Sequence, residues 1–62
     1  MSALSMPKMQ ILLIEDSPLL RRLLTETLDE IEGVHVCGFA ETEAEALEQL
    51  EVKSVDLAIV DI

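Results

Sequence analysis

The chain has almost no residues that could crosslink it internally. Its 62 residues include one cysteine, Cys37, and one histidine, His35. One cysteine cannot form an intramolecular disulfide, and these two side chains are too few for a closed zinc site. A chain this short buries only a small core, and it often depends on a disulfide, a structural metal or a partner chain. We therefore expect a partner chain, and we predict a homo-oligomer.

Positive charge and long apolar runs are scarce as well. Four Lys and Arg stand against thirteen Asp and Glu, which gives a net charge of −9. Because binding to a phosphate backbone requires a basic surface, this balance excludes direct nucleic-acid binding. The longest apolar runs, 11–14 and 57–60, are too short to cross a membrane, and residues 1–9 lack the apolar core of a signal peptide. We therefore expect a cytoplasmic chain with no membrane partner.

What the chain does contain is an alternation between two hydrophobic periods, which is typical of βαβ units. The continuous apolar run 11–14 favours a central strand covered on both faces, 57–60 is another continuous apolar run, and residues 34–39 alternate in polarity as an edge strand does. Two helices are predicted between these strands. Residues 1–9 have no period, and we interpret them as a flexible amino-terminal arm that precedes one βαβαβ unit over residues 10–62.

Capping signals predict where the two helices begin and end. Ser17 stands at the N-cap position of the first helix, and Gly33 is expected to end that helix as the residue after its C-cap. Thr42 and Glu45 have the spacing of a capping box, which predicts a second helix over about 43–51.

The charged residues of both helices have a simple interpretation. We expect Arg21 and Arg22 on the solvent-facing side of the first helix, where Arg22 can pair with Glu26 one turn later. We interpret the acids in and just before the second helix as a solvated face. They are Glu41, Glu43, Glu45, Glu48 and Glu51.

The order of the strands follows from the handedness of their connections. If both connections are right-handed crossovers, the first strand, which has the pattern of the most central strand, lies between the other two. The predicted fold class is therefore α/β, with three parallel strands in the order 2-1-3 and one helix on each face. The third strand has the composition of an interior strand but no predicted neighbour on its outer side.

Acidic residues end two of the predicted strands. Glu15 and Asp16 follow the first strand, and Asp61 follows the third. In the order 2-1-3 these strand ends flank the crevice where parallel sheets bind ligands. Because three carboxylates repel one another unless a cation lies between them, they predict a Mg²⁺ site. A carboxylate in such a site could act as the nucleophile toward a phosphoryl group.

These segments resemble the first half of a bacterial response-regulator receiver domain. The resemblance covers about residues 10–62 and is carried by ILLIEDSP, a leucine-rich helix, AETEAEAL and VDLAIVD. It implies a flavodoxin-like fold, of which this chain supplies the amino-terminal half. It also implies that Asp61 is the phosphoacceptor and that Glu15, Asp16 and Asp61 bind Mg²⁺.

The resemblance further implies a signalling domain rather than an enzyme, with a sensor histidine kinase or phosphotransfer protein as its partner. The family's Ser or Thr after strand four and Lys after strand five have no counterpart in this sequence. Phosphotransfer by this chain alone is therefore expected to be impaired.

The sequence leaves two other functions to consider. An interaction module without chemistry could self-associate through the third strand, whose outer edge is free to pair with a second copy. A nucleotide-binding enzyme is disfavoured because neither glycine-rich phosphate-binding motif occurs in the sequence.

Overall fold

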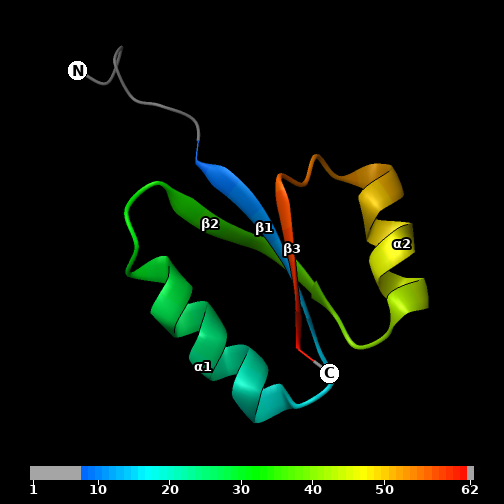
Figure 1. Cartoon of the computed structure of the whole chain (residues 1–62), viewed down its shortest axis with the longest axis horizontal. Coiled ribbons are helices and arrows are strands. Elements are labelled where there is room, and N and C mark those ends of the chain that lie inside the picture. Colours follow the sequence, from blue (N-terminus) through cyan, green and yellow to red (C-terminus); the bar gives the residue numbers. More distant parts are fainter. Residues whose placement is uncertain (1–7, 62) are drawn as a thin grey trace.

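Two helices alternate with three parallel strands in the computed structural model, which describes residues 8–61 (Figure 1). The elements are β1 (Met9–Glu15), α1 (Pro18–Asp29), β2 (Val34–Ala40), α2 (Glu43–Val52) and β3 (Leu57–Asp61). Residues 1–7 of the expected arm lie outside the described part of the chain. Met9 already belongs to β1, and its amide donates to the carbonyl oxygen of Gly33 at 2.7 Å.

The three strands form one parallel sheet in the order β2-β1-β3, which confirms the predicted topology. The β1–β3 register is regular, and it places Glu15 opposite Asp61 at the carboxyl ends. The β1–β2 register shifts between Ile11 and Leu12, so that Cys37 has no partner in β1. The Lys53 ammonium group of the α2 C-cap donates to the Cys37 carbonyl oxygen at 3.0 Å, which satisfies the backbone at this irregularity.

The two helices cover opposite faces of the sheet. Leu12 of β1 packs with Ala46 of α2. The next β1 residue, Leu13, is the register partner of Phe39, and Phe39 lies under the guanidinium group of Arg21 from α1. Because successive strand residues point to opposite faces, α2 lies on one side and α1 on the other, as predicted.

The core is concentrated in β1. All of its residues from Ile11 to Glu15 are buried, and Leu12 and Leu13 are fully inaccessible to solvent. β1 pairs with a strand on each edge and has a helix over each face, so a continuous apolar run suits it better than an alternating one. The apolar run of β1 therefore determines where the carboxyl ends of the strands meet.

The helix N-termini match their predicted caps, with one difference. The Ser17 hydroxyl oxygen accepts a hydrogen bond from the Leu20 amide at 3.3 Å, and Thr42 Oγ1 accepts one from the Glu45 amide at 3.2 Å. The Glu45 carboxylate, however, accepts from the amide of Glu41 at 2.8 Å rather than from that of Thr42. It still satisfies a free amide at the start of α2, one residue earlier than the capping box predicts.

The prediction that Gly33 directly ends the first helix is wrong. α1 ends at Asp29 with Glu30 as its C-cap, and Gly33 lies in the turn before β2 with φ of 85°. Glycine is favoured there because this left-handed conformation strains other residues. This conformation directs the chain into β2, which begins at the next residue. The carbonyl oxygen of Gly33 accepts a hydrogen bond from the Met9 amide.

Much apolar surface remains open. No residue of α1 is buried, and neither helix contacts β3 in the described part of the chain. Leu19 and Leu23 of α1 and Leu57 and Val60 of β3 are all at least partly open to solvent. Among the described residues, no helix is long and apolar enough to cross a membrane.

The central position of β1 predicts that substitutions in this strand destabilise the fold more than substitutions on the exposed side of a helix. Leu12→Ala removes a fully buried side chain and should lower the free energy of unfolding by about 2–5 kcal/mol. Leu19→Ala, at a residue 64% exposed on α1, should change it by no more than about 0.5 kcal/mol. Urea denaturation followed by far-ultraviolet circular dichroism measures both. Equal losses in the two variants would show that β1 is not the centre of the core.

Candidate functional site

An acidic crevice lies at the carboxyl ends of the strands. It has a volume of about 190 Å³. Its lining residues come from the ends of β1 and β3 and from the turns that lead into α1 and α2. They are Ile14, Glu15, Asp16, Glu41, Thr42, Glu43 and Asp61. All three acids predicted from the sequence therefore line one cavity, although Asp16 and Asp61 lie far apart in the chain.

The three predicted acids differ in their exposure. Glu15 is the last residue of β1 and is only 4% exposed. Asp61 is its register partner at the end of β3 and is open to solvent. Asp16 follows Glu15 on the turn into α1 and is also exposed. One buried and two accessible carboxylates therefore line the same crevice, where a cation would lower their mutual repulsion.

The donor chemistry of the crevice fits Mg²⁺, although its side chains are not gathered around a single point. In residues 8–61 no group of three His, Cys, Asp or Glu side chains lies close enough to hold a metal ion. Mg²⁺ prefers oxygen ligands, keeps several waters and needs only one or two carboxylates from the protein. Glu15, Asp16 and Asp61 offer carboxylate oxygens only, so the residues present suit this ion.

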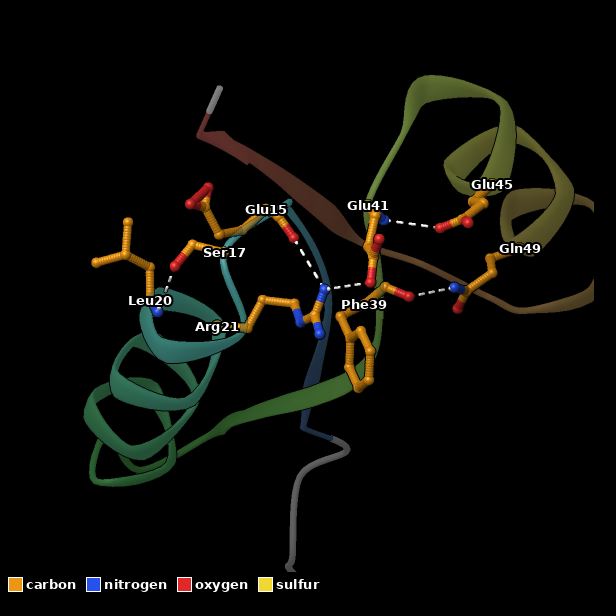
Figure 2. A network of polar contacts seen from close by, with 8 residues as sticks. All are labelled: Glu15, Ser17, Leu20, Arg21, Phe39, Glu41, Glu45 and Gln49. Atoms are coloured by element: carbon orange, nitrogen blue, oxygen red, sulfur yellow. Dashed lines mark hydrogen bonds and ion pairs between the residues drawn. The ribbon is translucent and has the colours of Figure 1, made fainter.

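Arg21 connects the two turns that border the crevice (Figure 2). Its Nη1 atom donates to the backbone carbonyl oxygen of Glu15 at 3.3 Å and to Oε1 of Glu41 at 3.0 Å. Its guanidinium carbon lies 4.5 Å from the centre of the Phe39 ring, which is within range of a cation–π interaction. One side chain of α1 thus contacts the ends of both β1 and β2.

The expectation that both arginines face solvent is wrong for Arg21 and right for Arg22. The Arg21 side chain is 14% exposed, whereas that of Arg22 is 78% exposed. Arg22 makes the predicted ion pair with Glu26 at 3.1 Å. Arg21 is half-buried because its guanidinium group reaches past the first turn of α1 to the carbonyl oxygen of Glu15 and the carboxylate of Glu41.

Glu41 and Glu43 are crevice acids that the sequence pattern does not reveal. The sequence predicts both on a solvated face, but both line the crevice, and Glu41 also pairs with Arg21. Glu41 directly follows Ala40, the last residue of β2. Since the carboxyl ends of parallel strands meet at one edge of the sheet, this position is the signal that could have found it.

Asp56 attaches β3 to β1 at the end opposite the crevice. Its amide donates to the Gln10 carbonyl oxygen at 2.8 Å, and its Oδ2 accepts from the Gln10 amide at 2.7 Å. These two hydrogen bonds directly precede the first residue pair between β1 and β3. They hold β3, which has no helix contact, in the register that brings Asp61 opposite Glu15.

Comparison with known proteins gives a consistent result. Residues 11–62 match the family model of the response regulator receiver domain. A protein-glutamate methylesterase/protein-glutamine glutaminase from Trichodesmium erythraeum (strain IMS101) is 35% identical over 57 residues, which cover 92% of this chain and 16% of that relative. The chain therefore spans about a sixth of the relative's length. No solved structure matches it significantly.

The paired bonds of Asp56 predict a specific loss of order in β3. Asp56→Ala removes a charge-assisted hydrogen bond to a backbone amide and should lower the free energy of unfolding by about 1–2 kcal/mol. Amide hydrogen exchange should become faster in β3 than in the other strands. The control, Asp29→Ala, replaces an exposed acid at the end of α1 and should leave β3 unchanged. Equal exchange in β3 for both variants would contradict this function of Asp56.

Proposed function

The chain belongs to the response regulator receiver domain family, and on this premise we propose that it accepts a phosphoryl group on Asp61 in a two-component phosphorelay. The register of β1 and β3 is the observation that carries this proposal, since it sets Asp61 opposite Glu15. Asp61 is the exposed member of that pair. A phosphodonor can therefore reach it, while Glu15 stays within the wall of the crevice.

The transfer is a nucleophilic substitution at phosphorus. An oxygen of the Asp61 carboxylate forms a bond to the phosphorus atom as the bond from phosphorus to the donor breaks. The leaving group, a histidine ring or an acetate ion, departs with the electron pair of that bond. The product is an acyl phosphate on Asp61, and the transfer needs no oxidant and no reactant besides the phosphodonor.

We propose Glu15, Asp16 and Asp61 as the side chains that hold Mg²⁺ during this transfer. When bound, Mg²⁺ offsets the negative charge that gathers on the crevice and on the phosphoryl group. Without a cation, an anionic donor would approach a crevice lined by acids and would be repelled. The acids therefore make the transfer dependent on the cation.

The proposed partner is a sensor histidine kinase or a phosphotransfer protein, and the proposed location is the cytoplasm. In this assignment the chain acts as a signalling domain. Its own chemistry is limited to self-phosphorylation from a donor.

Self-association is a second candidate, favoured by the state of β3. This strand pairs with β1 on one edge only and contacts neither helix, and Val60 in it is 55% exposed. An apolar strand with an open edge is a template for another strand. Two copies could pair these edges across a two-fold axis and form a continuous six-stranded sheet.

Phosphorylation of the chain by acetyl phosphate in the presence of Mg²⁺ tests the first candidate. Intact mass spectrometry after rapid acid quenching should show one added phosphoryl group on the native chain and none on Asp61→Asn. The control, Asp29→Asn, alters an exposed acid outside the crevice and should be labelled like the native chain. Removal of Mg²⁺ by a chelator should prevent labelling. Equal labelling of Asp61→Asn would refute the assignment of Asp61.

Sedimentation velocity over a wide concentration range tests the second candidate. Ile59→Lys places a charge in the middle of β3 and should convert a dimer to a monomer. Val52→Lys places the same charge at the end of α2, where the side chain is already 79% exposed, and should leave the dimer intact. A native chain that sediments as a monomer at all concentrations would exclude this pairing.

A further inference from the structure

Arg21 lies behind the wall of the acidic crevice and does not line it. The crevice is lined by acids, and Arg21 instead borders a second cavity, of about 290 Å³, together with Phe39 and residues of α1. From that side its guanidinium reaches the backbone of Glu15 and the carboxylate of Glu41. Arg21 is therefore placed to act on the crevice through Glu41.

The pairing with Arg21 changes what Glu41 contributes to the crevice. Glu41 is one of five acids that line the cavity, so five carboxylates could compete for one cation there. Its Oε1 atom, however, is bound by Nη1 of Arg21 at 3.0 Å. The ion pair neutralises one of these five charges and occupies an oxygen of that carboxylate.

We propose that Arg21 is a positioning residue that keeps Glu41 out of the cation's ligand set, and so leaves a coordination position for the phosphoryl donor. This inference rests on the proposed function of Asp61. Mg²⁺ requires six ligands in near-ideal octahedral geometry and uses waters and phosphate oxygens for several of them. A released Glu41 carboxylate would add a charged ligand and take one of those positions.

The proposal predicts opposite changes in two measured quantities when Arg21 loses its charge. Arg21→Met keeps an unbranched side chain over Phe39 but frees Glu41. Cation affinity should rise about fivefold, because a further carboxylate attracts the ion. Phosphorylation of Asp61 by acetyl phosphate should slow about tenfold at saturating cation, since the added carboxylate repels the anionic donor. If the substitution only disrupted the structure, the cation affinity and the phosphorylation rate would both fall.

A second substitution in Glu41 should reverse both effects. In Arg21→Met/Glu41→Gln no carboxylate is released, so the affinity and the rate should return to within about twofold of the native values. Arg21→Lys keeps a positive charge near Glu41 and should also remain near native. Arg22→Met is the matched control, because Arg22 is exposed and pairs only with Glu26 among the described residues.

The experiment uses the whole chain and Mn²⁺, which takes the same oxygen ligands as Mg²⁺. The electron paramagnetic resonance signal of free Mn²⁺ gives the affinity, intact mass gives the rate, and circular dichroism verifies that each variant is folded. Tighter binding with slower transfer in Arg21→Met, reversed by Glu41→Gln, is the expected result. Equal values for Arg21→Met and Arg22→Met, or a fall in both quantities for Arg21→Met, would overturn the proposal.

The native chain separates this proposal from the function on which it rests. If the native chain binds no Mn²⁺ and accepts no phosphoryl group, the assignment of Asp61 fails and Arg21 has no cation site to protect. If the native chain does both and the arginine variants match it, only the inference on Arg21 fails. If Arg21→Met does not fold, the cation affinity and phosphorylation rate of Arg21→Lys and of the double variant test the proposal instead. Tighter cation binding with slower phosphorylation in Arg21→Lys would contradict it.

Discussion

The other elements of the fold are arranged around the buried strand β1. Leu12 and Leu13 point to opposite faces and are both fully buried, so each face of this strand has to be covered. The two crossover connections meet that requirement with one helix per face and one strand per edge. The carboxyl ends of three strands then meet beside one crevice, and the acids that follow β1 and β3 are brought together.

The acids of the crevice repel one another, and one ion pair of the chain reduces this repulsion. Arg21 pairs with Glu41, whereas the structure records no ion pair for Glu15, Asp16 or Asp61 within residues 8–61. The crevice is therefore divided into one neutralised carboxylate and four, with Glu43 among them, that have no ion pair in the described part of the chain. That division agrees with the chemistry of phosphoryl transfer, in which a cation and an incoming anion have to share a small volume.

The sequence was sufficient for the elements, the strand order and three of the acids that line the crevice. Apolar runs, caps and handedness are local or generic signals, and they predicted β1, β3 and their order correctly. Arg21, Glu41 and Gly33 were misinterpreted for a shared reason. Their environments depend on how two turns approach each other, and a helical period cannot distinguish an arginine facing solvent from one that reaches a neighbouring turn.

Binding of one cation by Glu15, Asp16 and Asp61 can be tested by the paramagnetic broadening of backbone amide signals by Mn²⁺, using nuclear magnetic resonance of the isotope-labelled chain. If these three acids bind one cation, the signals of 15–16 and 61 should broaden together at the lowest Mn²⁺ concentration, before those of Glu48 and Glu51 on α2. Broadening that begins on α2, or that spreads evenly over all acidic residues, would contradict it.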